Sequence, residues 1–465
     1  MKKLLTIALF TLSSSVFTLC EAQYDTITNF QGVAGGANPI CHLVCMGKKF
    51  YGTAQYGGAS NLGTVFSVDT SGKGYKDMFD FAGASNGSVP SGALVVSVTG
   101  DSLFGVCNQG GTGGYGIVFS IDTNGTHFTV LHNFTGGAGG QYPDEGLVRS
   151  GSTLFGVTYS GGTGGGILFS IHTNGNDFKN ILNFGGVSGS TPEGSLIASG
   201  TQLFGTTSGG NGVIFSIDTN GTHLKSLHAF NGTSGSAPWG ALTLSKTTLY
   251  GTATTGGANS DGIIFSIDTT GTGFTDLFDF GGANGKTPNG YLVLSGTTIY
   301  GMTNLGGAHN LGVLFSVTTG GTGYADLHDF ANPTGGIPED GVTLIGNVVF
   351  GVTYSYGTTG NGVIFRFKQP GLGIDEMGPL TSSVNVYPNP SNGAFTLRVE
   401  SEKLKVESAS VEVYSMLGEK VYSQFSTLNS QLSINLSSQP GGVYLYRVIA
   451  EDGSMIGEGK MIIQK

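Results

Sequence analysis

Short apolar runs separated by glycine-rich turns recur along residues 24–369. Four series of residues mark the recurrence, and each series has seven members. An aromatic residue followed by glycine occurs at Tyr51-Gly52, Phe104-Gly105, Phe155-Gly156, Phe204-Gly205, Tyr250-Gly251, Tyr300-Gly301 and Phe350-Gly351. A phenylalanine within the next apolar run follows at Phe66, Phe119, Phe169, Phe215, Phe265, Phe315 and Phe365. A further phenylalanine occurs at Phe30, Phe81, Phe134, Phe184, Phe230, Phe280 and Phe330, and a proline at Pro39, Pro90, Pro143, Pro192, Pro238, Pro288 and Pro338. From Gly52 to Gly351 there are 299 residues over six steps, so the period is near 50 residues.

Each period contains four strand-like pieces and no helical spacing. In the sixth repeat they are Gly290–Ser295, Thr297–Thr303, Gly312–Thr318 and Tyr324–Phe330, and Gly, Ser and Thr separate them. Four strands at this period are typical of a propeller blade. The glycine after the aromatic residue predicts a close backbone approach inside the second strand, because glycine in a strand is otherwise unfavourable. The pattern therefore predicts an all-β body that is a seven-bladed β-propeller.

The phase of the repeat predicts how the ring closes. The first piece, Asp25–Phe30, matches the fourth strand of a repeat, and the last repeat stops after its third strand, Gly362–Phe367. We expect the N-terminal strand to complete the last blade, which would leave no open sheet edge between the termini. An open solenoid is the alternative, but it would need polar end caps, and the sequence shows none.

These repeats resemble the GloVer tandem repeat of secreted bacterial proteins. The resemblance covers residues 24–369, and the stretch that shows it best is PEGSLIASGTQLFGTTSGGNGVIFSIDTNGTHL, from Pro192 to Leu224. It implies a repeat-built secreted body. It implies no activity.

Composition changes near residue 370, where a linker over residues 370–383 leads into a charge-richer segment. Alternating strands at Phe395–Glu400, Ser410–Tyr414, Leu432–Leu436 and Val443–Ile449 predict a small Ig-like β-sandwich over residues 384–465. This segment resembles the type A sorting domain of the type IX secretion system. The residues that carry the resemblance are Tyr387, Pro388, Asn389, Pro390, Gly393, Gly418, Gly442, Tyr444 and Lys460. The resemblance implies the type IX machinery as a partner, and release from the cell or attachment at the outer surface. A general adhesive sandwich is the alternative.

Residues 1–22 have the pattern of a signal peptide. Lys2 and Lys3 precede an apolar stretch from Leu4 to Leu19, and small residues at Cys20 and Ala22 suit cleavage. Lipidation at Cys20 is the second reading, since the bulky Leu19 is unusual at such sites. We expect no transmembrane segment in the mature chain, because no other long apolar stretch occurs.

The charge excludes one class of function, and the number of cysteines excludes one kind of cross-linking. The 465 residues include 83 glycines, and the formal net charge is −10 with no clustered cations, which excludes nucleic-acid binding. After signal cleavage three cysteines remain, Cys41, Cys45 and Cys107, so a full disulfide framework is excluded. They are best read as buried small apolar residues, although Cys107 could pair with one of the other two.

The best candidate site is the set of residues that follow the repeated proline. In an up-and-down blade this position lies just before the innermost strand, so it should ring the central channel. It varies between repeats, and Ile40 and Ser91 occupy it in the first two. The ligand-binding candidates among these residues are Asp144, Glu145, Glu193, Trp239, Asn289, Glu339 and Asp340. Carboxylates and an aromatic plate suit a glycan or surface polysaccharide, or a cation such as calcium. A solvated loop without ligand is the alternative.

Two further sequence patterns, an Asp-box-like turn and a set of repeated histidines, give less support for a functional site. The turn Ser216–Thr222 resembles the Asp box of sialidases, but that box is a structural turn, and the two arginines of the repeats, Arg149 and Arg366, cannot form the three-arginine site of those enzymes. His132, His228 and His328 occupy equivalent places in different repeats, so they should not converge on a metal, and we predict no metal site and no cofactor.

The sequence favours a secreted or surface-attached protein with a binding or scaffold role. A carbohydrate-active hydrolase or lyase is second, with Glu193 and Glu339 as the carboxylate pair, and we assign no catalytic residue. A purely structural surface component is third.

Overall fold

The computed structural model describes residues 23–369, 384–399, 408–415, 420–427, 432–450 and 455–465. The chain divides into two compact units, one ending at Pro370 and the other beginning at Gly371. We call residues 23–369 the repeat body and residues 384–465 the C-terminal unit. The expected signal peptide (1–22), the expected linker (370–383) and Gly418 lie outside the described residues.

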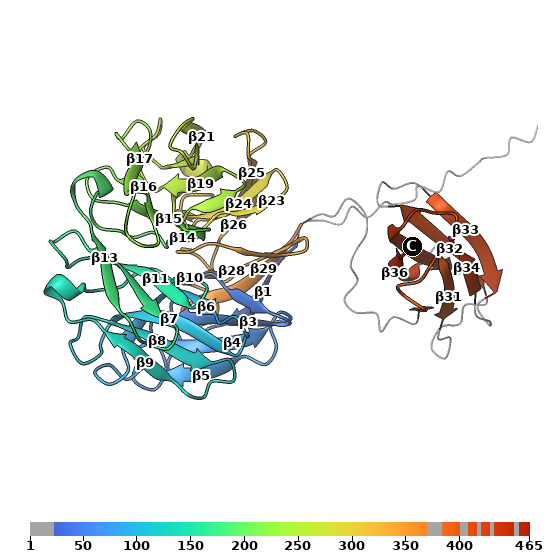
Figure 1. Cartoon of the computed structure of the whole chain (residues 1–465), viewed down its shortest axis with the longest axis horizontal. Helices are drawn as coiled ribbons and strands as arrows, with labels where there is room; N and C mark the ends of the chain where they lie inside the picture. The colour runs from blue at the N-terminus through green and yellow to red at the C-terminus, as the bar shows by residue number, and fades with distance from the viewer. Residues whose placement is uncertain (1–22, 370–383, 400–407, 416–419, 428–431, 451–454) are drawn as a thin grey trace, which may run out of the picture. The chain divides into compact units, whose positions relative to one another are not determined.

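The repeat body consists of antiparallel sheets in which strands follow chain order (Figure 1). The first two sheets contain β2 (Val44–Met46), β3 (Lys49–Ala54), β4 (Thr64–Asp69) and β5 (Lys76–Asp80), then β6 (Ser88–Val96), β7 (Ser102–Gln109), β8 (Ile117–Asp122) and β9 (Thr129–Asn133). The next two contain β10 (Val148–Ser150), β11 (Thr153–Thr158), β12 (Ile167–His172) and β13 (Lys179–Asn183), then β14 (Ile197–Ser199), β15 (Gln202–Thr207), β16 (Val213–Asp218) and β17 (Lys225–Ala229). The sheet after these contains β18 (Thr243–Ser245), β19 (Thr248–Ala253), β20 (Ile263–Asp268) and β21 (Thr275–Asp279).

The last two sheets of the body depart slightly from this plan. One contains β22 (Lys286–Pro288), β23 (Val293–Ser295), β24 (Thr298–Leu305), β25 (Val313–Thr318) and β26 (Ala325–Asp329). The other combines β27 (Thr343–Ile345), β28 (Val348–Thr353) and β29 (Val363–Lys368) with β1 (Gln23–Asn29) from the start of the chain. Three short 3-10 turns, η1 (Gly137–Gly139), η2 (Gly186–Ser188) and η3 (Gly282–Asn284), lie between sheets, and the described residues contain no α-helix. Most innermost strands have only three residues, so the predicted six-residue strand Gly290–Ser295 is wrong in length.

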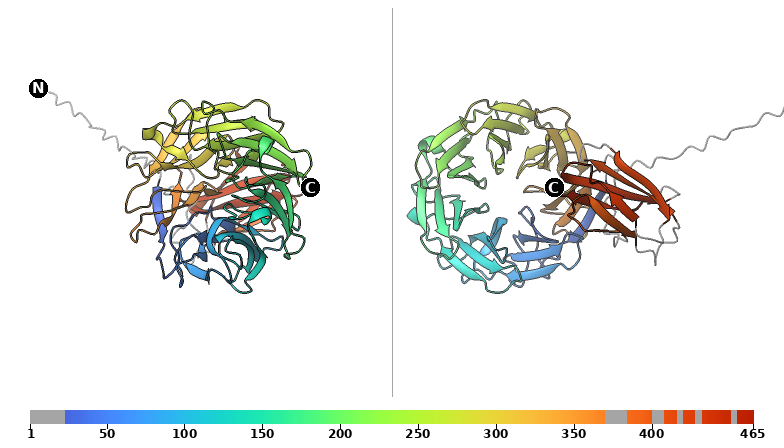
Figure 2. Two further views of the ribbon diagram at one scale, coloured as in Figure 1. Left: turned by 90° about the vertical axis from the view of Figure 1, so that its left-hand side faces the viewer. Right: turned by 45° about the vertical axis from the view of Figure 1, so that its right-hand side comes forward.

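The N-terminal strand pairs with the last sheet, as the phase of the repeat predicts. β1 runs antiparallel to β29 with Thr26 opposite Phe365 and Asn29 opposite Val363, and Phe30 N donates to Gly362 O at 3.1 Å. Figure 2 shows the sheets of the repeat body following one another around a ring. The two ends of the body thus share one sheet.

Each hydrophobic cluster of the body is shared by two neighbouring sheets. The two phenylalanine series explain the packing, because the ring at the end of each outermost strand meets the third-strand ring of the next sheet edge to face. The pairs are Phe30–Phe66, Phe81–Phe119, Phe134–Phe169, Phe184–Phe215, Phe230–Phe265, Phe280–Phe315 and Phe330–Phe365, with ring centroids 5.1–5.4 Å apart. The Phe30–Phe66 pair joins the last sheet to the first, and Phe50 packs on Phe350 in the same cluster. The same contact therefore links every sheet to the next, including across the chain ends.

The repeated glycine faces a ring and not a backbone. Gly251 lies directly opposite Phe265 in the β19–β20 pair, and a Cβ on Gly251 would lie 2.6 Å from Phe265 Cζ and 2.9 Å from Leu242 Cδ2. The expected backbone approach is therefore wrong. The glycine and third-strand phenylalanine series are two halves of one cross-strand pair, in which the absent side chain makes room for the ring.

A larger residue in place of Gly251 should overpack the hydrophobic cluster around Phe265. We expect Gly251→Val to destabilise the protein by about 1–3 kcal/mol or more, the usual cost of overpacking. Urea denaturation of the purified chain measures this effect. Gly320→Val is the matched control for added bulk, because Gly320 lacks a positive φ and its Cβ would meet only Thr318 Oγ1, at 3.9 Å. An unchanged unfolding midpoint in Gly251→Val would contradict the packing described here.

The C-terminal unit contains two antiparallel sheets. One has the order β30 (Val384–Tyr387), β31 (Ala394–Val399) and β34 (Leu432–Asn435), and the other β33 (Lys420–Thr427), β32 (Ser408–Ser415), β35 (Gly442–Ala450) and β36 (Met455–Ile463). Their inner side chains, such as Phe395, Val413 and Tyr446, form one core. The sequence predicts β31, β32, β34 and β35 and misses β30, β33 and β36, because glycines and polar residues obscure the alternation in β36.

Candidate functional site

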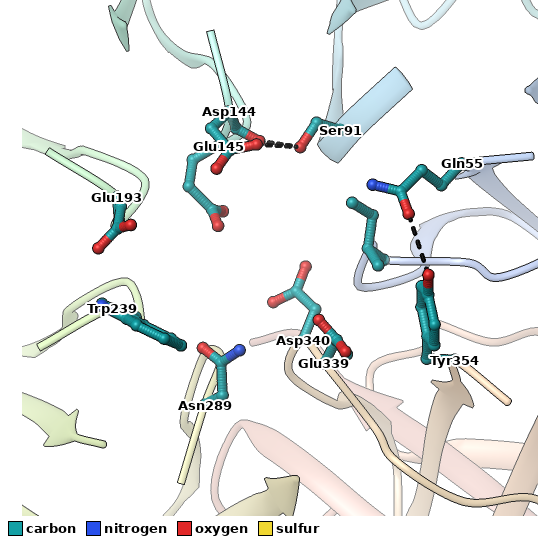
Figure 3. A pocket seen from close by; sticks show the side chains of 11 residues that line it. Gln55, Ser91, Asp144, Glu145, Glu193, Trp239, Asn289, Glu339, Asp340 and Tyr354 are labelled. Carbon is teal, nitrogen blue, oxygen red and sulfur yellow. Dashed lines mark hydrogen bonds between the residues drawn. The ribbon is translucent and has the colours of Figure 1, made fainter. Parts of the chain in front are cut away.

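A cavity of about 400 Å³ collects side chains from all the repeats. Its lining consists of Ile40, Gln55, Ser91, Asp144, Glu145, Glu193, Trp239, Asn289, Glu339, Asp340 and Tyr354. We call it the mouth pocket. Figure 3 shows the labelled side chains around it. Every candidate predicted from the position after the repeated proline lines this pocket. Equivalent residues of different sheets can meet in this way because they precede the innermost strands.

The backbone before each proline is strained in the same way. The residue that precedes the repeated proline has positive φ in every repeat: Asn38, Val89, Tyr142, Thr191, Ala237, Thr287 and Ile337, with φ between 51° and 60°. Side chains with a branched Cβ, such as Val89 and Ile337, disfavour this conformation. Backbone hydrogen bonds hold it; Gln55 N, for example, donates to Asn38 O at 3.1 Å. The strained turn sets the backbone position of the residue after proline, which lines the pocket.

Two lining residues lie outside the predicted set. Gln55 and Tyr354 follow the second strands β3 and β28, and Tyr354 Oη donates to Gln55 Oε1 at 3.3 Å (Figure 3). The sequence could have indicated both residues, because the second strands end on the same side of a blade as the loop that carries the proline. The residue after the second strand varies between repeats. The same kind of variation identified the candidates that follow the repeated proline.

Asp144 and Glu145 form the most buried acidic pair of the pocket. Ser91 Oγ donates to Asp144, and Asn108 Nδ2 donates to Asp144 Oδ1 at 3.0 Å. Burial raises the pKa of Asp144 despite these bonds. Burial also raises the pKa of Glu145 well above its usual range, and the charges of Asp340 and Asp144 raise it further. Ser195 Oγ donates to Glu145 Oε2 at 3.3 Å.

Glu193 and Glu339 come from non-adjacent repeats and are less enclosed. Burial raises the pKa of each carboxyl, and the charge of Asp144 adds to both effects. Glu193 Oε2 is buried and has no hydrogen-bond partner among the described residues. Both carboxyls therefore hold protons more tightly than in water, and Glu193 has an acceptor that the protein itself leaves unused.

Asp340 is the carboxylate that the fold keeps ionised. Burial alone would raise its pKa, but His42 and the backbone N–H of Gly341 outweigh burial and lower it. His42 N donates to Asp340 Oδ2 at 2.7 Å, His42 Nδ1 lies 3.5 Å from the same oxygen, and the His42 ring stacks on Tyr291. One wall of the pocket therefore carries a fixed negative charge.

Trp239, which is 40% exposed, supplies the aromatic surface. Asn289 lies beside it in the next repeat (Figure 3). No lysine or arginine lines the pocket. Across the part of the chain that the structure describes, no group of three or more His, Cys, Asp or Glu side chains could hold a metal ion, so the calcium hypothesis gains no support.

The repeated histidines are packing residues. His132 stacks on Phe178 at 3.6 Å and His228 on Phe274 at 3.7 Å, and His328 stacks on Tyr24 at 3.7 Å, so each ring joins two sheets. Burial lowers the pKa of His132 and of His328 to about 4. Cys41, Cys45 and Cys107 are free thiols in the structure.

In the turn that resembles an Asp box, the expected role of aspartate is only partly right. Asp268 Oδ1 accepts the Thr270 N–H, but in the equivalent turn Asn220 accepts the Thr222 N–H, and Asp218 Oδ2 lies 2.7 Å from His223 Nδ1. The turns are structural and face away from the pocket, because they join the third and fourth strands.

The sorting-motif residues of the C-terminal unit hold its last strand in place. Asn389 Nδ2 donates to Lys460 O at 2.7 Å, and Ile462 N donates to Asn389 Oδ1 at 2.8 Å. Gly393 has φ of +114°, and a Cβ added there would lie 2.6 Å from Ser437 Cα, so the position admits no side chain. Tyr444 is buried, whereas the side chains of Tyr387 and Lys460 are exposed.

Comparison with protein families agrees with this division. The Gloeobacter/Verrucomicrobia repeat matches residues 10–211 and 207–391. The chain belongs to this repeat family. The secretion system C-terminal sorting domain matches residues 385–464, so the C-terminal unit is a sorting domain of the type IX pathway. A repeat protein with this domain is exported, and it is then attached to the outer surface or released. No curated protein matches the chain.

Two solved structures are similar to this chain at low sequence identity. Oligogalacturonate lyase from Vibrio parahaemolyticus is 10% identical, with 76% of this chain and 95% of that chain covered and a TM-score of 0.51. A candidate 6-phosphogluconolactonase from Bacteroides uniformis is 12% identical, with 89% and 98% covered and a TM-score of 0.44. The likeness concerns the fold alone, and the first of these supports a propeller-like all-β body. Within the described residues, no helix has the length and apolar character needed to cross a membrane.

Proposed function

We propose that this member of the Gloeobacter/Verrucomicrobia repeat family is a closed seven-bladed propeller that binds a saccharide in its mouth pocket outside the cell. The sorting domain supports the location. The pairing of β1 with β29 and the Phe30–Phe66 contact support closure of the ring. In this view the sorting domain is a small Ig-like sandwich, residues 1–22 are its signal peptide, and residues 370–383 link the two parts.

One observation carries the binding role: the repeats are alike in their packing residues and differ where they line the pocket. Proline, phenylalanine and glycine recur at their positions in every repeat. The position after proline instead holds Ile40, Ser91, Trp239, Asn289 or a carboxylate. A structural ring needs no such variation. Carboxyl, amide and hydroxyl groups around an aromatic plate can bind sugar hydroxyls and a sugar face.

The charge of the pocket narrows the saccharide class. Asp340 is held ionised, four further carboxyls lie in the same lining, and no cationic side chain faces them. A saccharide with free amino groups would offset this negative charge and could place an ammonium against the Trp239 ring.

Binding should therefore depend on Trp239, on amino groups and on pH. We expect a chitosan oligosaccharide to bind the purified full chain, and Trp239→Ala to weaken binding roughly tenfold or more. Affinity should be highest at an intermediate pH and should fall on both sides of it. At higher pH the amino groups of the oligosaccharide lose their positive charge, and at lower pH the pocket loses negative charge, because burial raises the pKa of Glu145, Glu193 and Glu339. Isothermal titration calorimetry measures both effects.

The matched control is Tyr387→Ala, which removes a similarly exposed aromatic side chain of the sorting domain that does not line the pocket. Equal binding by Trp239→Ala and the parent chain would refute the proposal, as would equal binding of the N-acetylated oligosaccharide.

Hydrolysis is the second candidate, favoured by the raised pKa of Glu193, because a carboxyl that keeps its proton can act as a general acid. Turnover of a glycan that Glu193→Gln abolishes, with binding retained, would establish it.

A further inference from the structure

The β33-β32-β35-β36 sheet of the sorting domain has one buried face and one exposed face. Tyr444, Tyr446 and Met461 point into the core. On the opposite face Val443 and Leu445 are 39% and 47% exposed, although they lie in the interior of the sheet on β35. Val443 is paired with Ile462, and Leu445 lies between Tyr414 and Lys460. We call Tyr414, Val443, Leu445, Lys460 and Ile462 the outer sheet face.

Cationic side chains surround this apolar strip. Lys460 is exposed and has no polar side-chain partner within the described ranges. Lys420 Nζ and Arg447 Nε share Glu412, at 2.7 and 2.6 Å, and the Arg447 guanidinium lies 5.0 Å from the centre of the Tyr414 ring. The register also places Glu458 opposite Arg447, on the same face of the sheet. Three cations and two carboxylates leave this face with one excess positive charge, in a chain whose formal net charge is −10.

The motif residues divide by what their side chains do. Asn389 and Gly393 fix the backbone around β36 and β34, and Tyr444 fills the core. Lys460 does neither, and its side chain stands beside the exposed Leu445. Asn389, Gly393 and Tyr444 thus explain how the domain folds, so recognition by a partner has to use other, exposed side chains of the domain.

We propose that the outer sheet face is the surface by which the sorting domain docks on the export machinery, and that the complementary surface of that machinery is acidic with an apolar centre. The domain belongs to a secretion pathway, which supplies the partner. Exposed aliphatic side chains in the middle of a sheet, bordered by cations, match an interface with an apolar core and a charged rim.

The test is export of the full-length chain in a bacterium that carries a type IX system. We expect Leu445→Asp combined with Val443→Asp to lower the amount outside the cell at least tenfold, and Lys460→Glu to lower it several-fold. A chain that ends at Ser382 sets the level without a sorting domain. Ser433→Asp is the matched control, because Ser433 is exposed on β34 of the other sheet and should leave export unchanged.

A loss of export through misfolding has to be distinguished from a loss of export through weaker docking. Leu445→Ser removes the apolar contact with little effect on a half-exposed position, and the thermal midpoint of the purified chain should stay within about 2 °C of the parent. Loss of export at an unchanged midpoint supports the proposal. Normal export of the double variant overturns it, and so does a dimer of the parent chain that the double variant dissociates, since a second copy would then cover this face. Neither result depends on the mouth pocket.

Discussion

Removal of the closing strand should open the repeat body and make it self-associate. A chain that begins at Gln31 lacks β1, so β29 loses its partner and becomes an unpaired edge. The same deletion removes the contact between the Phe30 and Phe66 rings. It also removes Tyr24, whose ring stacks on His328 and Phe365. We expect the thermal midpoint to fall by more than ~10 °C, and light scattering to show oligomers whose size grows with concentration.

Addition of the missing strand provides the control for this deletion. A synthetic peptide of residues 23–30 should raise the midpoint and reduce oligomer size, whereas a scrambled peptide of the same composition should do neither. A deleted chain that remains monomeric with the parent midpoint would show that the ends are not joined through this strand.

Phe265→Ala should produce the largest loss from a single side chain. Phe265 is fully buried, lies opposite Gly251, and contacts the rings of Phe230 and Phe274 at 5.4 and 5.6 Å. Truncation leaves a cavity between two sheets and should cost about 3–5 kcal/mol in the free energy of unfolding. Urea denaturation followed by tyrosine fluorescence and circular dichroism measures it.

The control is Val98→Ala, which truncates a side chain that is 77% exposed and should change stability by less than ~0.5 kcal/mol. A Phe265→Ala effect equally small would mean that the third-strand phenylalanines do not hold the sheets together.

Most of the fold could be read from the repeat because each recurrent residue has one packing role. The offset of Asp25–Phe30 from the other repeats predicted the β1–β29 pair, since only the missing fourth strand of the last repeat could accept it. The role of Gly251 could not be derived, because a backbone neighbour and an aromatic ring both require glycine. β36 was missed because Gly457 and Gly459 interrupt its alternation, and the loop at Asn389 that fixes this strand is remote in sequence.

The lining of the pocket could be predicted because strand order fixes which end of each repeat faces the centre. Trp239 and Glu193 were found from their place after proline. The ionisation of Asp340 could not be foreseen, since it depends on His42, almost 300 residues earlier in the chain, and on a backbone N–H whose direction no pattern reveals.

The shared last sheet also makes the two ends of the repeat body neighbours. Gln23 lies directly opposite Lys368 across the β1–β29 pair. A short peptide bridge between these residues, with new termini in a loop between sheets, would preserve every strand pairing of the body. The repeat body should therefore tolerate circular permutation. Its N- and C-termini could then be placed in any of the loops that connect neighbouring sheets.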